Sequence, residues 1–241
     1  MEFRGSAGMM ATRIRRAAAT VAAALLMLVQ PALGQAQETD APSGEGFFSI
    51  GVQHADIEDL NHQLDGMGYP TFDRTMLAIG GGGYTVRDGG LMLGGEGYGL
   101  LTGENSVQSR SVSLGGGHGF FTIGYLRKLS PTLEVYPMIG LGGGGMRMAI
   151  GPQAAPDSFD DVLEDPDRQV AMHRGGLLLS LGGGVTHRFG DEPGGLTLGV
   201  RAGYVLEPYS VAWRMDGNVV SDGPDAAMAG PFLRVTLGHR K

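Results

Sequence analysis

The chain has 241 residues, 42% of them hydrophobic and 18% charged, with a formal net charge of −7, and this length suits one sizeable domain. The excess of acidic residues argues against a nucleic-acid partner, because phosphate binding needs clustered Lys and Arg, and the absence of Cys excludes disulfides and thiolate metal sites. The 44 Gly residues lack the three-residue period of collagen and lie inside apolar runs, so they indicate neither collagen nor disorder.

The first 36 residues have the pattern of a secretory signal peptide. A cluster of arginines precedes a short apolar run at 17–29, and small residues suited to cleavage follow it. The apolar run is too short to cross a bilayer as a helix. We therefore expect residues 1–36 to be removed on export, residues 37–45 to form a flexible leader, and residues 46–241 to form one β-barrel domain.

After this leader, apolar residues alternate with small or polar residues at a period of two, which is the pattern of β-strands. The clearest run is 173–189, where the odd positions are mainly apolar and the even positions are small or polar. The same pattern predicts eight strands, which in chain order are 46–54, 74–87, 90–102, 108–129, 132–150, 171–189, 195–214 and 227–239.

The connection after the first strand is predicted to hold a short helix. Ile57, Leu60, Leu64 and Met67 recur at helical spacing, and a Gly-Tyr-Pro sequence follows them. The stripe fits a helix that lies over a barrel mouth, which is the favoured interpretation because short apolar stripes usually just pack. A plug inserted into the lumen is the alternative.

The fourth and fifth predicted strands are less regular. In the fourth, apolar residues move from even to odd positions near Gly115–Gly119, and a β-bulge would explain the change. In the fifth, Pro137 cannot donate a ladder hydrogen bond, which predicts a bulge or a strand end.

The connections between the predicted strands alternate in length. Three are short, at 87–90, 129–132 and 190–194, and the other four, three of them long, are at 55–73, 103–107, 151–170 and 215–226. This alternation is typical of an up-and-down barrel in the outer membrane, with short periplasmic turns and longer outer loops. The fold class predicted is therefore all-β, an antiparallel up-and-down barrel of about eight strands.

The chain after the signal peptide has no apolar run of 18 residues and hence no predicted transmembrane helix. A closed barrel is the other structure that satisfies every backbone group in lipid. Glycine clusters near the middle of most strands are interpreted as a girdle without side chains that permits strong coiling. The alternative is a cavity left for a ligand or for an inserted segment. These clusters are at 80–83, 94–97, 115–117, 142–145 and 182–184.

With these features the chain resembles the small eight-stranded outer-membrane barrels, such as the OmpA transmembrane domain and OmpX-like proteins, over roughly residues 46–241. The resemblance depends on the signal peptide, the alternating strands and aromatic residues near predicted strand ends. These aromatic residues are Phe47, Phe48, Tyr84, Tyr125, Phe189, Tyr209 and Trp213.

Charged residues on the small or polar faces of the strands are expected to form an ion network in the lumen, because buried charges must be paired. The members predicted are Glu96, Arg174, Arg201, Glu207 and Arg234. The pairing expected is that of Glu207 with Arg201 or Arg234. The alternative is that these side chains lie near the rims, in water.

No sequence motif assigns catalytic, cofactor-binding or metal-binding residues. The six His residues show no metal-binding spacing, and no nucleophile elbow is present. The acidic residues of 157–167 have the oxygen ligands that Ca²⁺ or Mg²⁺ takes, but a solvated loop is the favoured interpretation.

The function expected is that of a non-catalytic outer-membrane barrel with a structural or surface-interaction role and a closed or plugged lumen. Its expected partners are outer-membrane lipid and the outer-membrane assembly machinery, and its expected state is a monomer. The alternative is a soluble periplasmic barrel that carries a small apolar ligand in the manner of lipocalins. A third, less favoured hypothesis is a membrane-embedded enzyme that acts on lipid.

Overall fold

The computed structural model describes residues 43–103, 105–107, 110–152, 160, 170–190 and 194–241. The signal peptide predicted at 1–36 and most of the predicted leader lie outside the described residues. Eight long strands are present, β1 (Ser43–His54), β2 (Thr75–Val86), β3 (Leu91–Leu101), β5 (Arg110–Tyr125), β7 (Leu133–Pro152), β8 (Val170–Arg188), β9 (Gly195–Ser210) and β12 (Gly230–Arg240). Four short strands, one α-helix and one 3-10 helix complete the described elements: β4 (Asn105–Val107), β6 (Arg127–Lys128), β10 (Arg214–Met215), β11 (Asn218–Val219), α2 (Glu58–Gly66) and η2 (Asp88–Gly90).

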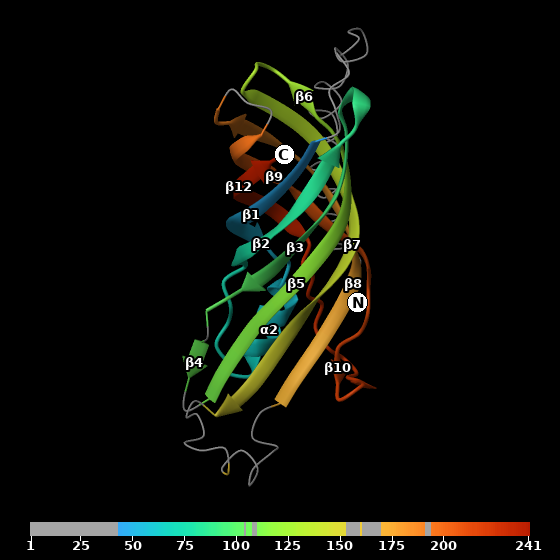
Figure 1. Ribbon diagram of the computed structural model, residues 1–241. Helices are drawn as coiled ribbons and strands as arrows, with labels where there is room; N and C mark the ends of the chain where they lie inside the picture. Colours follow the sequence, from blue (N-terminus) through green and yellow to red (C-terminus); the bar gives the residue numbers. More distant parts are fainter. Residues whose placement is uncertain (1–42, 104, 108–109, 153–159, 161–169, 191–193) are drawn as a thin grey trace, which may run out of the picture. The chain divides into compact units, whose positions relative to one another are not determined.

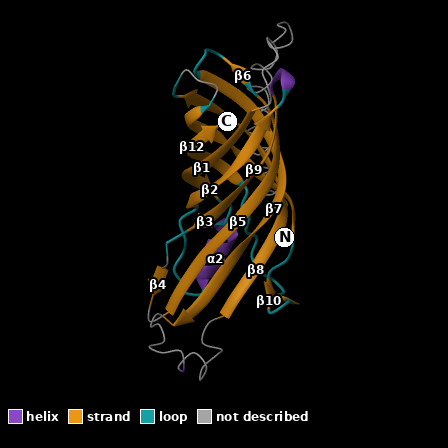
Figure 2. Ribbon diagram, in the orientation of Figure 1, coloured by secondary structure: helices purple, strands orange, loops and turns teal. Residues whose placement is uncertain are grey.

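The eight long strands form a closed antiparallel barrel (Figures 1 and 2). Each long strand pairs with the next along the chain, and β12 pairs with β1 to complete the ring. The prediction of an all-β up-and-down barrel with eight strands and a short helix in the first long loop is confirmed. β1 begins at Ser43 rather than at the predicted residue 46, so the end of the predicted leader belongs to the barrel.

The short and long connections lie at opposite ends of the barrel. The short connections follow β2, β5 and β8, and their end, which we call the turn end, also contains the start of β1 and the end of β12. The other end, the loop end, contains α2, β4, β10 and β11. There β5, β7 and β8 continue past the other strands and form an extension of the barrel wall (Figure 1).

The bulge predicted near Gly115–Gly119 is absent, because β5 keeps one register with β7 from Arg110 to Gly124. The even positions of β5 point inward throughout, and what changes along the strand is the chemistry of the barrel interior. Val112 and Leu114 belong to an apolar cluster at the loop end. An irregularity of register instead lies between β8 and β9, near Leu179.

Pro137 lies inside β7, opposite Gly183 of β8. On its other side the pairing with β5 stops at Met138, and it resumes with β6 at Val135. The bulge or strand end predicted for β7 at Pro137 is therefore absent, and the proline instead coincides with the end of the pairing with the neighbouring β5.

Helix α2 packs its apolar stripe against the inner face of the extension. Leu60 and Leu64 of the helix and Ile57 before it are buried, and they share a cluster with Val112 and Met148 of the strands. Met67, which was predicted to belong to the stripe, is 70% exposed, because the helix ends at Gly66. Among the described residues, no helix is long and apolar enough to cross a membrane.

Candidate functional site

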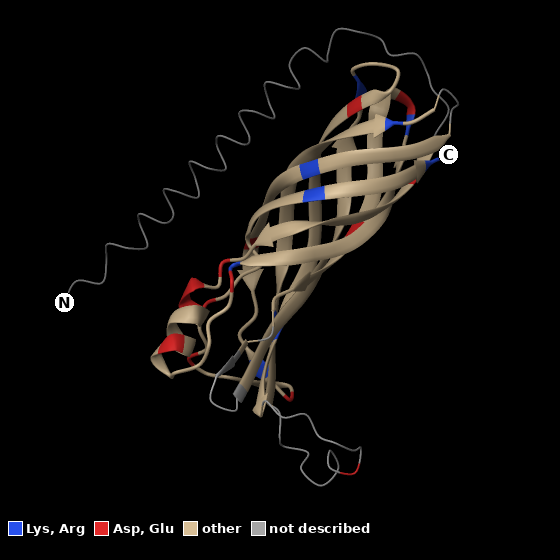
Figure 3. Ribbon diagram, turned by 90° about the vertical axis from the view of Figure 1, so that its left-hand side faces the viewer, with Lys and Arg blue, Asp and Glu red and all other residues tan. Residues whose placement is uncertain are grey.

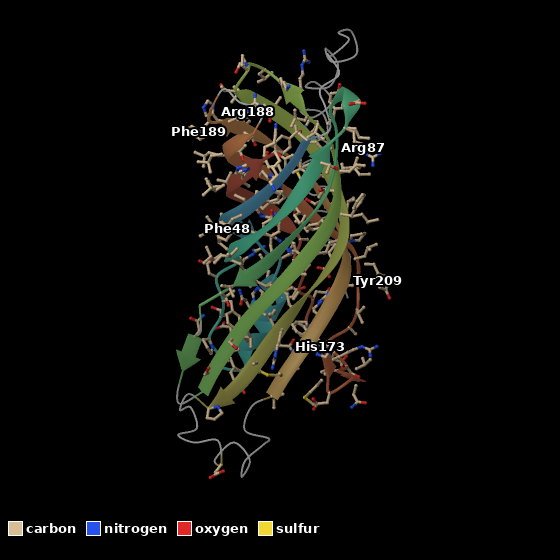
Figure 4. All side chains as sticks on the ribbon, viewed as in Figure 1. Phe48, Arg87, His173, Arg188, Phe189 and Tyr209 are labelled. Carbon is tan, nitrogen blue, oxygen red and sulfur yellow. The ribbon has the colours of Figure 1, made fainter. Side chains whose placement is uncertain are left out.

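The outer face of the barrel carries a belt of exposed apolar side chains. In a closed barrel successive residues point alternately in and out, and these exposed residues alternate with buried neighbours on all eight long strands. We call them the apolar belt: Phe48, Ile50, Val52, Leu77, Leu91, Leu101, Phe121, Ile123, Tyr125, Ile139, Leu141, Leu177, Val185, Leu196, Leu198, Val200, Leu233, Val235 and Leu237. Figure 4 shows side chains projecting outward around the barrel.

The inner face carries charged and polar side chains, beginning with a cluster at the turn end. Arg240 of β12 donates to Glu45 of β1 at 2.8 Å and to Glu134 of β7 at 2.6 Å, and all three residues are buried. The hydroxyl of Tyr84 lies 3.2 Å from the same guanidinium, and Thr197 donates to Glu45 at 3.1 Å. The cluster joins the first and last strands of the barrel to its middle strands.

A second cluster surrounds Glu96 of β3. Arg201 of β9 donates from Nη1 to the Glu96 carboxylate at 2.8 Å and from Nε to the hydroxyl of Tyr136 at 2.9 Å. Tyr98 donates to the same carboxylate at 3.1 Å. The Arg201 guanidinium also stacks over the ring of Phe47, 4.0 Å from its centroid. One carboxylate thus fixes side chains from several strands.

Arg234 of β12 forms the other side of this cluster. Its Nη1 lies 4.0 Å from Glu96, its Nη2 donates to Gln53 at 2.9 Å, and the same atom lies 3.2 Å from Nε2 of His118. The guanidinium lies 3.5 Å from the centroid of the Tyr98 ring, a geometry that favours a cation–π interaction. With 1% exposure, Arg234 is among the most buried large side chains of the barrel.

A third cluster lies nearest the loop end. Arg174 of β8 pairs with Glu207 of β9 at 3.6 Å, and Glu207 also accepts the backbone N–H of Met228 at 2.9 Å. The Arg174 guanidinium lies 5.8 Å from the centroid of the Trp213 ring. Beyond this cluster the interior becomes apolar and meets helix α2.

All five residues predicted for the lumen network have buried side chains that point inward. The pairing expected for Glu207, with Arg201 or Arg234, is wrong: its partner is Arg174, and Glu96 is the residue that lies between Arg201 and Arg234. Glu207 lies near the loop end of β9, six residues from Arg201, so its side chain is at a different height along the barrel axis from Arg201 and Arg234. The odd or even position of a residue in a strand (its parity) indicates which face the residue occupies. It does not indicate the height along the barrel axis at which the residue meets a partner.

Glu45, Glu134 and Arg240 also belong to the buried charges of the lumen and were not among the predicted members. Arg240 shares the even parity of Arg234, and Glu134 that of the inward residues of β7, so the alternation could have included both. Glu45 was assigned to the leader, although its odd position matches the inward residues of β1. These additions give four buried carboxylates and four buried guanidiniums among the described residues of the barrel, which balances their formal charge. They are Glu45, Glu96, Glu134, Glu207, Arg174, Arg201, Arg234 and Arg240.

The inward glycines of the clusters lie opposite the large side chains of the lumen. A Cβ atom on Gly82 would lie 2.9 Å from the Cβ of Glu96, and one on Gly184 would lie 2.6 Å from the ring of Tyr136. The glycines therefore leave the space that the network fills. A cavity beside Glu96 and Arg201 has a volume of about 10 Å³, close to the least that holds one water molecule.

Two glycines test this division between the faces. Gly142→Ala, on the inner face, is expected to cost about 1–3 kcal/mol or more, because its Cβ would overlap the backbone of Gly119. Gly97→Ala, on the outer face, is expected to change stability by less than about 0.5 kcal/mol, because its nearest contact would be 3.6 Å away. Denaturant unfolding of the folded barrel measures both, and equal costs would contradict the assignment.

The aromatic residues predicted near strand ends divide between the two faces. Phe48, Tyr125, Phe189 and Tyr209 are exposed, and Figure 4 shows Phe189 near the turn end and Tyr209 nearer the loop end. Phe47, Tyr84 and Trp213 also lie near strand ends, but their side chains are buried in the lumen or under the loop end.

No catalytic or metal-binding arrangement stands out in the described part of the chain. The described residues contain no group of three or more His, Asp or Glu side chains that could hold a metal ion. Most of the acidic segment 157–167 lies outside the described residues. Figure 3 shows acidic residues on and around α2, where Arg74 forms exposed ion pairs with Asp56 and Glu58.

No protein-family model and no curated protein matches the chain. Among solved structures, it is similar to Ail, the attachment invasion locus protein of Yersinia pestis, with 10% sequence identity and a TM-score of 0.45 over 85% of this chain and 100% of that one. Ail in complex with the heparin analogue sucrose octasulfate gives 0.44 with the same identity and coverage. A major outer membrane protein from Thermus thermophilus gives 11% identity and 0.41 over 83% and 98% of the two chains.

Proposed function

We propose that this protein is a non-catalytic outer-membrane β-barrel whose lumen is closed and whose loop end carries a surface-interaction role. The observation that carries the proposal is the apolar belt, which runs around all eight long strands. Exposure of such a surface to water is unfavourable, and monomeric soluble proteins rarely expose an apolar area of this extent. Hydrocarbon does favour it, and a closed barrel leaves no unpaired strand edge in the lipid.

The contents of the lumen support a barrel that does not conduct. Three clusters of charged side chains follow one another from the turn end to the loop end, and α2 covers the apolar interior beyond them. An eight-stranded barrel has an interior just wide enough for its own side chains. Transport of solutes would require several buried ion pairs to separate, which is strongly unfavourable.

The same observations disfavour a soluble carrier of the lipocalin kind. A carrier of an apolar ligand has an apolar cavity inside and a polar surface outside. Here the buried face has four carboxylates and four guanidiniums, the exposed face has the belt, and the cavity beside Glu96 is about 10 Å³ in volume. A drug-sized ligand needs about 300 Å³ or more.

The proposal extends to orientation and partners. The short turns, the start of β1 and the end of β12 would face the periplasm, and the loop end would face outward, as in up-and-down outer-membrane barrels. Lipid would contact the belt, and the outer-membrane assembly machinery would insert the chain. A monomer is the proposed state, because ring closure leaves every long strand paired on both sides within one chain.

Fractionation of cells that express the full chain tests this proposal. We expect the protein in the outer-membrane fraction, and we expect its band on a denaturing gel to shift on boiling, because a closed barrel resists the detergent until heated. A conductance measurement in planar bilayers is expected to show no open channel. Recovery of the protein in the soluble periplasmic fraction would contradict the membrane assignment, and steady conductance would contradict the closed lumen.

A further inference from the structure

Three basic side chains form a row across the outer face of the barrel near its loop end. In the strand register Arg147 of β7 lies opposite His173 of β8, and His173 lies opposite Arg214 of β10. All three residues are exposed. Residues that face each other on antiparallel neighbours have Cα atoms about 4.5–5.5 Å apart, so these three side chains form one group. We call them the basic row.

The basic row points away from the lumen. Each member has a buried neighbour in the chain: Met146 beside Arg147, Arg174 beside His173, and Trp213 beside Arg214. Since successive residues of a strand point to opposite faces, the row lies on the outer face.

No carboxylate of the described residues forms an ion pair with the basic row. The ion pairs among the described residues involve Arg74 and the four lumen arginines instead. Among the described residues, the row has one side-chain hydrogen bond, from Nη1 of Arg214 to the carbonyl of Gly217 at 3.3 Å. Arg147 and Arg214 flank His173 in this register, so their two positive charges repel each other. An anion that bound all three side chains would remove this cost.

The height of the row matches the head-group layer of a membrane that covers the apolar belt. The belt residue Leu177 pairs with Tyr209 of β9, and exposed tyrosines mark membrane interfaces. His173 lies four residues beyond Leu177, about 13 Å along the strand and about 10 Å along the axis of a tilted barrel. Figure 4 shows His173 nearer the loop end than Tyr209. Long arginine side chains reach several ångströms back towards the belt.

On β5, β7 and β8 the outer face between the row and the belt consists of glycines. Gly145 of β7 lies opposite Gly175 of β8 and opposite Gly117 of β5, all on the outer face. This leaves a floor of backbone directly below the basic row, with room for a head group that is bulkier than a single phosphate.

We propose that the basic row binds the phosphate groups of a phosphorylated glycolipid in the outer leaflet. This inference rests on the proposed function, which places the loop end outward. Guanidinium groups match phosphate oxygens in both charge and geometry, and the glycine floor fits the sugar that carries the phosphates. A glycolipid head group would thus be held by β7, β8 and β10 together.

Binding of bisphosphorylated lipid A to the purified full chain in a non-ionic detergent tests this site. The bound lipid is measured by native mass spectrometry, and dephosphorylated lipid A and phosphatidylglycerol are the comparison ligands. The double variant Arg147→Gln/Arg214→Gln is expected to bind bisphosphorylated lipid A at least about tenfold more weakly than the wild type. Arg87→Gln, an exposed change at the turn end, is the matched control and is expected to bind like the wild type.

Three results would overturn the inference: equal binding of lipid A with and without its phosphates, an unchanged affinity of the double variant, or an equal loss in the control. Phosphatidylglycerol bound as tightly as lipid A at the row would overturn the assignment to a glycolipid.

Stability in the same detergent without lipid provides a second readout. The double variant is expected to resist denaturant as well as the wild type or better, since two like charges are removed. Lower stability would show that the chain itself neutralises these arginines and would overturn the inference. A wild-type protein found soluble in the periplasm would contradict the proposed function, whereas a protein that inserts normally but ignores the phosphates would overturn the basic-row site alone.

Discussion

Glu96→Ala is expected to lower the free energy of unfolding by about 3–5 kcal/mol, because it leaves buried charge without a partner. The Glu96 carboxylate lies 2.8 Å from Arg201 and 4.0 Å from Arg234, and both arginines have side chains less than 5% exposed. Removal of one carboxylate therefore exposes two guanidiniums to an interior that cannot solvate them. Denaturant unfolding of the purified barrel in detergent, followed by tyrosine and tryptophan fluorescence, measures the change.

The exposed pair of Glu58 and Arg74 is the control for this prediction. Their side chains are 60% and 37% exposed, and Glu58→Ala is expected to cost less than about 1 kcal/mol. If Glu96→Ala does not fold, Glu96→Gln keeps a carbonyl oxygen for the arginines and is expected to fold with a smaller loss. Equal, small losses for Glu96→Ala and Glu58→Ala would contradict the role of the network in holding the barrel together.

Val200→Arg is expected to cost about 2–4 kcal/mol in a bilayer, because it places a charge near the middle of the apolar belt. Val200 is 48% exposed and lies between Leu198 and the loop end on β9. Urea unfolding of the protein in phosphatidylcholine vesicles measures the cost, with gel mobility of the unboiled sample as the readout of folded barrel.

Thr85→Arg is the matched change at the edge of the belt. Thr85 is exposed on the outer face of β2 near the turn end, where an arginine reaches the head groups and is expected to cost at most about 1 kcal/mol. A neutral effect at Val200 would show that the outer face of the barrel lies in water and would contradict the membrane proposal.

The strands were predictable from the sequence because alternation is a local property. Residues of 173–189 alternate so regularly that strand β8 and its faces follow from the pattern alone, and the short connections fixed the order of the neighbours. The ends were less certain: β1 began three residues early, and no local signal separates a leader of small residues from the first residues of a strand.

The pairs within the lumen were not predictable to the same degree. Parity places Glu207 inside, but its partner depends on the stagger between strands and on the irregular register near Leu179, which lies between β8 and β9. In β5 the move of apolar residues from even to odd positions was interpreted as a bulge, because a bulge shifts the face on which the following residues lie. Instead the interior is apolar where α2 packs on it, which explains why an apolar residue, Val112, occupies an inward position there.

The pairing of β1 with β12 has a consequence for how the chain folds. The two strands that complete the ring are the first and the last, and Glu45 meets Arg240 across 195 residues of sequence. Contacts so remote in sequence form slowly, because the entropy of closing the loop is lost before the contacts repay it. The ring therefore cannot close before its final strand, β12, is synthesised, and until it closes β1 exposes an unpaired edge that a chaperone must keep from aggregating.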